Sequence, residues 1–397
     1  MTRQNEKPNA SGKLLAGSNV NIAPERSEIE VSLFGPGYGE SIVVHLGENL
    51  WLIVDSCLDP LTGDPAPLTY LHHLHIDLAT AVRWVVATHW HDDHIRGLGR
   101  IMHVCESAEL VCSAALKHPE FLTLVTAYGH YSMMESPPVQ EFYEILQALA
   151  AQGPQRPGKR PRPPTFVTPG RCIWQSTIEV SGVNHPCSIY TLSPSDASIV
   201  LAHSHLATLM PQLKTTKLRI PALTPNYTAV VLWVNIVAVF ILLGSDLEEI
   251  SNPDTGWSVI LGSRTYPPGK ASLFKVPHHG SHTGHHPQVW QDMLDTAPVA
   301  ILTPFALGNV SLPTPPDVER ICQRAEQAYA TAMPRRRRRR GRPQVVEKLM
   351  RDTVGSSIRE VYTSTGHIRL RANLAETPLA WRVELFGEAC PLSNIYR

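Results

Sequence analysis

Three histidines and two aspartates stand within residues 88–94 (THWHDDH), directly after an apolar run. His89 and His91 are two residues apart, so their side chains point the same way in an extended loop. Asp93 and His94 project towards a second point nearby, so this one loop could hold two cations. Nitrogen and oxygen ligands without cysteine suit Zn²⁺, Mn²⁺ or iron, and a ligand set left open to water is catalytic rather than structural. The alternative is a histidine-rich surface loop without a cation.

Two further groups of metal-ligating side chains stand where an apolar strand gives way to a loop. Asp246 ends the sequence LLGSD, and a lone carboxylate in such an apolar setting is costly unless it meets a cation. We therefore expect Asp246 to be a ligand that can bridge two cations. His278 and His279 follow another apolar run and precede a glycine. Strand periodicity does not decide which of these two histidines binds metal.

Apolar runs predict the strands that carry these residues. In the first part of the chain they fall at residues 31–34, 41–45, 50–54 and 83–87. In the second part they fall at residues 189–192, 199–201, 229–234, 237–243, 272–276, 358–372 and 380–386. Helical spacing and capping residues predict helices at 97–105, 139–151 and 318–331. This alternation indicates two β-rich halves with helices on the outside.

The composition is that of a folded protein with balanced charge. Of the 397 residues, 43% are apolar, which is ample for a buried core, and 35 Lys and Arg balance 35 Asp and Glu. No overall field therefore draws the chain to nucleic acid or to membranes. The seven cysteines form no CxxC pair and are odd in number. This argues against a disulfide framework and favours a reducing cytoplasm.

Residues 1–27 are polar and lack the apolar core of a signal peptide. We therefore expect a flexible N-terminal leader followed by one domain over residues 28–397. The one candidate membrane segment, residues 229–244, is shorter than the roughly 20 residues that a bilayer requires, and it contains Asn235. Two buried strands joined by a tight turn explain it better. We expect no contact with a membrane.

Two basic segments are expected to be insertions into this domain. Residues 152–170 are rich in Pro, Gly, Lys and Arg, which predicts an exposed loop. Residues 333–355 contain six successive arginines, from Arg335 to Arg340. Their mutual repulsion fits a solvated insert that does not pack. The same run could instead be an arm that contacts phosphates and releases counterions on binding nucleic acid.

These motifs resemble those of the metallo-β-lactamase superfamily, whose HxHxDH loop corresponds to residues 89–94 and whose bridging aspartate corresponds to Asp246. The similarity is closest to the metallo-β-lactamase-like domain of ComEC-type DNA-uptake proteins and their free-standing relatives. Five motifs carry it over about residues 30–372: a Gly-Asp-Ser turn that is Gly39-Glu40-Ser41 here, LIVDS at 52–56, LLGSD at 242–246, KVPHHGS at 275–281 and VYT…GHI at 361–368. The membrane-channel part of ComEC is not present, which implies a soluble hydrolase.

The resemblance implies an α/β fold, the four-layer αβ/βα sandwich, with the ligands at one edge. It also implies two divalent cations, Zn²⁺ or Mn²⁺, that share Asp246. The other ligands would be His89 and His91 for one cation, and Asp93, His94 and His279 for the second. Many members of the superfamily add a third histidine to the first cation. Three histidines lie in the right interval but without a recognisable motif around them: His185, His203 and His205.

Three other polar residues each have two interpretations. Asp55 could accept a hydrogen bond from a ligand histidine and fix its tautomer, or it could be an ordinary turn residue. Lys275 could face the substrate or lie along the surface with its charge in water. Ser281 could face the substrate or be a polar turn residue.

The resemblance also implies a hydrolase mechanism. Two nearby cations lower the pKa of a shared water and clamp the attacking and leaving oxygens of a phosphoester. Asp93 and Asp246 would act in catalysis, and His278 would contact a phosphate oxygen or protonate the leaving group. The leading hypothesis is a metal-dependent phosphodiesterase or nuclease, with nucleic acid as the substrate because of the ComEC resemblance and the arginine run. The alternatives are a hydrolase of a small ester, lactone, cyclic nucleotide or phosphocholine-type diester, and a metal-binding scaffold without catalysis.

Overall fold

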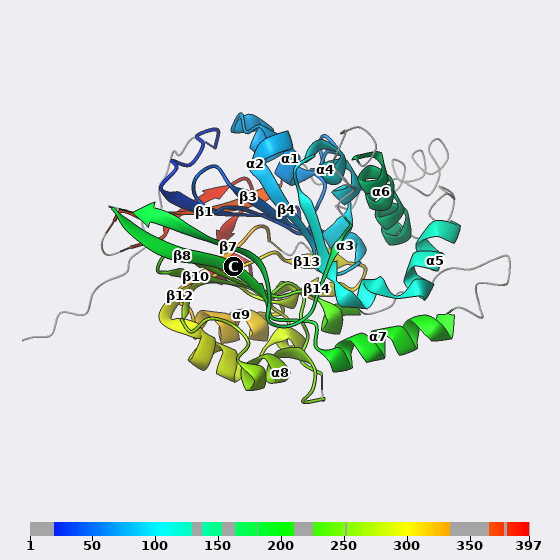
Figure 1. Ribbon diagram of the computed structural model, residues 1–397. Helices are drawn as coiled ribbons and strands as arrows, with labels where there is room; N and C mark the ends of the chain where they lie inside the picture. Colours follow the sequence, from blue (N-terminus) through cyan, green and yellow to red (C-terminus); the bar gives the residue numbers. More distant parts are fainter. Residues whose placement is uncertain are drawn as a thin grey trace, which may run out of the picture.

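The computed structural model describes residues 20–128, 137–152, 163–180, 182–209, 225–250, 252–333, 365–376 and 379–396. Within them, two eight-stranded sheets lie face to face, and helices pack against the outer face of each (Figure 1). The four-layer αβ/βα sandwich expected from the sequence is therefore confirmed. Most of the predicted leader and the whole arginine run lie outside the described residues.

The first sheet combines an antiparallel and a parallel half. In spatial order its strands are β17 (Arg382–Phe386), β16 (Gly366–Asn373), β1 (Glu28–Gly35), β2 (Ser41–His45), β3 (Trp51–Val54), β4 (Val82–Ala87), β5 (Glu109–Ser113) and β6 (Thr165–Val167). Neighbours are antiparallel from β17 to β3 and parallel from β3 to β6. Every residue of β1, β2 and β3 is buried, because other layers cover both faces of the sheet.

The second sheet has the same two kinds of pairing. In spatial order its strands are β18 (Cys390–Pro391), β15 (Gln327–Ala330), β12 (Leu294–Leu302), β11 (Ala271–Lys275), β10 (Val239–Leu243), β9 (Leu232–Ile236), β8 (Val183–Thr191) and β7 (Arg171–Val180). β15, β12, β11 and β10 are parallel to one another, and the strands on either side of them are antiparallel. A separate hairpin consists of β13 (Phe305–Leu307) and β14 (Val310–Leu312).

Apolar clusters hold the four layers together. The cluster between the sheets contains Val31 and Leu33 of β1 and Ile241 and Leu243 of β10. The outer face of the first sheet packs against α1 (Ala66–His73), α2 (Leu78–Ala81), α4 (Leu98–Val104), α5 (Pro119–Tyr128) and α6 (Pro137–Gln152). The outer face of the second sheet packs against α8 (Gly256–Ser263) and α9 (Pro315–Cys322). Each sheet is thus covered on both faces over its central strands, whereas the edge strand β7 is largely exposed.

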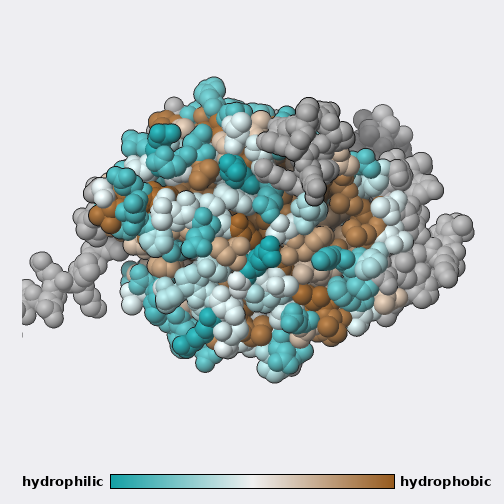
Figure 2. Space-filling model, viewed as in Figure 1, coloured by the Kyte–Doolittle hydropathy of each residue, from teal (hydrophilic) through white to brown (hydrophobic). Residues whose placement is uncertain are grey.

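The surface seen in Figure 2 mixes hydrophilic and hydrophobic residues over both sheet layers. Hydrophobic residues gather towards the side on which α5 and α7 (Asp196–Leu209) lie in Figure 1, where Leu122 and Val200 are exposed. Among the described helices, none is both long and apolar enough to cross a membrane. The run of residues 229–244 instead forms the buried hairpin of β9 and β10, as the sequence predicts.

Three predictions about individual elements are wrong. Residues 199–201 lie inside α7, because a short apolar run does not distinguish a strand from a buried helix. The helix predicted over residues 318–331 ends at Cys322, and Gln327–Ala330 forms β15 because it pairs with β12. The loop predicted over residues 152–170 is described only in part, and there Thr165–Val167 forms β6 against β5.

Two opposed glycines let the sheets approach each other beside the site. Gly35 at the end of β1 pairs with Gly366 at the start of β16. A Cβ on Gly366 would lie 1.5 Å from the carbonyl oxygen of Thr331, and a Cβ on Gly35 would lie 2.6 Å from the methyl group of Thr303. Thr303 in turn accepts a hydrogen bond from His279. The missing side chains therefore set the distance between the sheets at this end.

We expect Gly366→Ala to lower the free energy of unfolding by about 3 kcal/mol, because the added methyl group forces packed backbone apart. Denaturant titration followed by tryptophan fluorescence measures this change. Gly262→Ala is the matched control, because Gly262 is exposed on α8 and its Cβ would meet nothing within 4 Å. There alanine should stabilise the protein by up to about 1 kcal/mol. If the two substitutions changed the free energy of unfolding equally, the close approach of the two sheets at Gly366 would be contradicted.

Candidate metal centre

The side chains singled out by the sequence lie where strands of both sheets end. Residues 89–94 follow β4 of the first sheet, and the last of them begin the short helix α3 (Asp92–Ile95). Asp246 follows β10, and His279 follows β11, both in the second sheet. These three strands belong to the parallel parts of their sheets. Their carboxyl ends meet at one edge of the sandwich, where sites in α/β folds commonly form.

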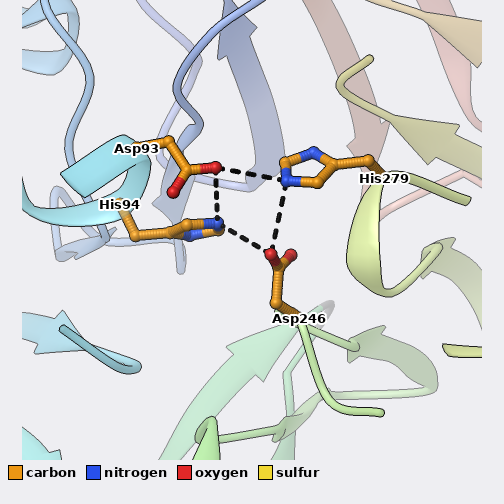
Figure 3. Close-up of side chains that lie close together, drawn as sticks. All are labelled: Asp93, His94, Asp246 and His279. Carbon is orange, nitrogen blue, oxygen red and sulfur yellow. Dashed lines mark ion pairs between the residues drawn. The ribbon is translucent and has the colours of Figure 1, made fainter. Parts of the chain in front are cut away.

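Four side chains converge on one point at this edge (Figure 3). His94 Nε2 lies 3.2 Å from Asp246 Oδ2, and His279 Nε2 lies 3.3 Å from both Asp246 Oδ2 and Asp93 Oδ2. Each residue offers one ligand atom, and the four atoms all lie within 4.8 Å of one another. All four side chains are buried. Two imidazole nitrogens and two carboxylate oxygens that face one small space fit a divalent cation.

Opposite charges stabilise one another in this cluster. Burial alone would raise the pKa of the Asp93 and Asp246 carboxyls, yet the imidazoles of His94 and His279 hold both pKa values below the usual range. Burial would lower the pKa of the histidines, yet the two carboxylates raise the pKa of His94 well above its usual value and that of His279 to about 10. Protonated histidines thus balance the carboxylates in the way that a cation would.

Asp55 follows β3 directly. It contacts His94 itself and is linked to His89 through Thr88. His94 Nδ1 donates to Asp55 Oδ2 over 2.8 Å, so His94 Nε2 faces the cluster. The hydroxyl of Thr88 donates to the same oxygen over 2.7 Å and lies 3.0 Å from His89 Nδ1. Asp55 therefore accepts a hydrogen bond from a candidate ligand histidine, which is the first of the two interpretations that the sequence allowed. Such carboxylates fix the tautomer of a ligand and its direction.

His89 and His91 form a second pair of nitrogen ligands beside this cluster. His89 Nε2 lies 3.2 Å from His91 Nδ1, and the ring centroids of His89 and His94 are 4.3 Å apart. Burial, reinforced by the neighbouring histidines, lowers the pKa of His89 well below its usual value. The neutral imidazole is the form that binds metals. The pair is therefore suited to a second cation next to the first.

The three histidines considered as a further ligand lie elsewhere in the fold. His185 lies near the tip of the β7–β8 hairpin, at the end of the second sheet away from the site. His203 and His205 belong to α7. His205 Nδ1 lies 2.8 Å from the hydroxyl of Tyr227, and the ring of His203 lies 4.0 Å from that of His118 between centroids.

His278 contacts a different set of residues from His279. Both residues have a positive φ, 48° and 54°. His278 Nδ1 lies 2.8 Å from Thr283 Oγ1 and 3.1 Å from Glu248 Oε1, and its Nε2 lies 3.2 Å from the amide nitrogen of Asn226. Burial would raise the pKa of Glu248, but its hydrogen bond with His278 holds this pKa below the usual range. The sequence indicated no role for Glu248 or Asn226, because neither belongs to a motif.

Lys275 is fully buried beside Asp246, so its interpretation as a surface lysine is wrong. Its Nζ lies 2.6 Å from Glu40 Oε1 and 3.6 Å from Asp246 Oδ1. Burial would lower the pKa of this ammonium group, but the two carboxylates raise it above the usual value. Ser281 accepts a hydrogen bond from the backbone nitrogen of Thr283, as a polar turn residue does.

A cavity of about 300 Å³ lies beside Asp93. Its lining includes the side chains of Tyr38, Leu58 and Arg96. Arg96 pairs with Asp92, and its guanidinium lies 5.3 Å from the centroid of the Tyr38 ring. The cavity provides space for a substrate next to the cluster, and its lining combines apolar residues with Arg96 and with Asp59, Asp92 and Asp93.

Residues 34–173 match the family model of the metallo-beta-lactamase superfamily. The match contains residues 89–94, whereas Asp246 and His279 lie beyond it. This match and the two-sheet architecture agree with the metallo-β-lactamase fold and support the superfamily resemblance drawn from the motifs. The closer similarity to ComEC-type domains stays a prediction. A comparison with curated proteins found no match.

Two solved structures are similar to this chain at 14% sequence identity. One is the metallo-beta-lactamase fold protein YhfI from Bacillus subtilis, with a TM-score of 0.31, covering 62% of this chain and 69% of that protein. The other is a metallo-beta-lactamase from Pontibacter korlensis, with a TM-score of 0.28, covering 63% of this chain and 87% of that protein. Neither likeness bears on activity or substrate.

We expect Asp55→Asn to weaken divalent-cation binding by about 10–100-fold, because His94 and His89 lose the carboxylate that orients them. Asparagine tolerates the positive φ of this position, 58°, so the fold should persist. Competition with a chromophoric chelator measures the affinity without any substrate. Asp92→Asn is the matched control, because Asp92 lies in the same loop but pairs with Arg96. A similar loss in both variants would contradict the orienting role of Asp55.

Cation binding should release protons. The pKa of His279 is raised to about 10 and that of His94 well above its usual value, so both are protonated at pH 7 and must lose these protons to bind metal. The apparent affinity should therefore rise as the pH rises from 7 towards 10. Without a cation, protonation of His94 and His279 contributes to the free energy of unfolding. This contribution is present in full below about pH 6.5 and is lost as the pH rises towards 10. Calorimetry in buffers of different ionisation enthalpy should count about two protons released at pH 7 when a cation binds between His94 and His279. A count near zero would contradict this charge state.

Proposed function

We propose that the protein is a divalent-metal-dependent hydrolase that cleaves phosphodiesters, with nucleic acid as its substrate. The observation that carries this proposal is the convergence of four buried ligand atoms within 4.8 Å, next to the His89–His91 pair. Cations held there would supply a hydroxide nucleophile at neutral pH and positive charge for the phosphate oxygens. Zn²⁺ and Mn²⁺ both accept this set of nitrogen and oxygen ligands.

Two residues near the cluster, His278 and Arg96, have further roles in the proposed reaction. His278 is only partly buried, and Glu248 Oε1 lies 3.1 Å from its Nδ1 and orients the ring. His278 can therefore hold a proton for the leaving oxygen. Arg96, which lines the cavity beside Asp93, can donate hydrogen bonds to a phosphate.

Two features of the sequence favour nucleic acid over a small diester. One is the motif resemblance to a DNA-processing domain, and the other is the arginine run. Arg335 to Arg340 lie outside the described residues, so their part in binding is proposed from charge alone. The ligand cluster itself would serve either kind of substrate, because a metal-activated hydroxide attacks phosphorus irrespective of what the diester carries.

The test offers protein loaded with Zn²⁺ or Mn²⁺ to single- and double-stranded DNA, to RNA and to bis(p-nitrophenyl) phosphate. We expect cleavage that a chelator abolishes and that either cation restores. Asp246→Asn should lower kcat/KM by at least about 100-fold. This is more than the loss of a residue that only hydrogen-bonds to a metal ligand would cause. Asp295→Asn is the control, because Asp295 is exposed at the opposite end of β12 and should leave activity unchanged. Cleavage of a lactone or carboxyl ester with every phosphodiester left intact would refute the phosphodiesterase proposal.

A further inference from the structure

A buried ion pair that this chemistry does not use lies behind the ligand cluster. Lys275 Nζ lies 2.6 Å from Glu40 Oε1 and donates to the carbonyl oxygen of Ser245 over 2.8 Å. Both charged side chains are buried, Lys275 at 0% exposure and Glu40 at 1%. A buried ion pair is often no more stabilising than a well-packed apolar pair of the same size. Stability alone therefore does not account for these two charges.

Glu40 is connected to two of the ligand residues. Its backbone nitrogen donates to the carbonyl oxygen of Asp93 over 2.9 Å. Its Oε2 accepts a hydrogen bond from the hydroxyl of Thr303. The carbonyl oxygen of Thr303 accepts from His279 Nδ1 over 3.0 Å, which leaves His279 Nε2 directed at Asp93 and Asp246.

Lys275 acts on a third ligand residue through its charge. Its Nζ lies 3.6 Å from Asp246 Oδ1, too far for a hydrogen bond but close enough for attraction. Asp246 Oδ1 is buried and has no hydrogen-bond partner among the described residues. The other oxygen, Oδ2, faces His94 and His279. Glu40, a full ångström nearer to Nζ than Asp246 is, keeps the ammonium group from pairing directly with the ligand.

The pair also joins the two sheets next to the fourth ligand residue. Glu40 lies in the turn between β1 and β2 of the first sheet, and Lys275 ends β11 of the second. The neighbouring Ser41 donates from Oγ to the carbonyl oxygen of Asp55 over 2.9 Å. Asp55 in turn orients His94. All four ligand residues are therefore connected to Glu40 or Lys275: Asp93 and Asp246 directly, His279 through Thr303, and His94 through Asp55 and Ser41.

We propose that Glu40 and Lys275 are positioning residues that set the affinity of the cluster for a divalent cation. Glu40 holds Lys275 at a distance from which the ammonium group orients Asp246 without competing for it. Asp246 Oδ2 then remains available to the cation. This inference rests on the metal dependence proposed above and adds which residues outside the ligand set control it.

The test measures the affinity for Zn²⁺ and for Mn²⁺ by competition with a chromophoric chelator, with no substrate present. Glu40→Gln keeps the shape of the side chain but removes its charge, so Lys275 turns to Asp246 and competes with the cation. We expect the affinity to fall by about 10–100-fold. Adding Lys275→Met removes the competing charge, so the double variant should recover about half of the logarithmic loss and stay below the wild type.

Glu384→Gln is the matched control, because Glu384 pairs over 2.5 Å with the buried Arg369 in the first sheet, apart from the ligand cluster. It should lower the melting temperature and leave the cation affinity unchanged. Unchanged affinity in Glu40→Gln, or an equal loss in Glu384→Gln, would overturn the inference.

Three further outcomes keep the test decisive. If Glu40→Gln does not fold, the double variant without either charge decides, and wild-type affinity in it would overturn the inference. A wild-type protein that binds no divalent cation would refute the proposed metal dependence together with the inference. If the wild type binds cations and Glu40→Gln binds them with the same affinity, the inference is refuted and the proposed metal dependence is not.

Discussion

Charged side chains buried between two sheets are the constraint on which this structure depends. A charge removed from water costs free energy unless an opposite charge compensates it. At one edge of the sandwich, the carboxylates of Asp93 and Asp246 are compensated by the imidazoles of His94 and His279. Each sheet supplies one carboxylate and one imidazole, and the ion pairs His94–Asp246 and His279–Asp93 cross from one sheet to the other. The packing of the sheets and the electrostatics of the site are therefore a single requirement.

The residues that contact the ligands from behind also compensate and hold these buried charges. Asp55 orients His94, and the Glu40–Lys275 pair lies against Asp246. Side chains held in this way have little rotational freedom to lose when a cation binds, so more of the binding free energy is retained. The positive φ of His279 has a related effect, because it directs that ring to the cluster while the ring of His278 contacts Glu248.

The sequence predicted those parts of the site in which the signal is local. Residues 89–94 and Asp246 could be recognised because several ligand types stand together at the end of an apolar run. The burial of Lys275 and the role of Glu248 could not be predicted, because both depend on which strands become neighbours. The same physical reason explains the errors at residues 199–201 and 327–330, where tertiary contacts decide between helix and strand. Local pattern predicted two β-rich halves with outer helices, and the motif resemblance implied the four-layer sandwich, whereas the network behind its ligands required the three-dimensional arrangement.

The first sheet is completed by two strands from far along the chain, β16 and β17. β16 pairs with β1, and Arg371 on β16 bonds to Glu30 on β1 although the two residues are 341 positions apart. Such distant pairing is slow, because the entropy of closing the loop is lost before the contact forms. During translation, the edge of β1 stays unpaired until residues 366–373 have left the ribosome. An exposed strand edge invites association with other chains, so the nascent protein passes through a long interval in which it is vulnerable to aggregation.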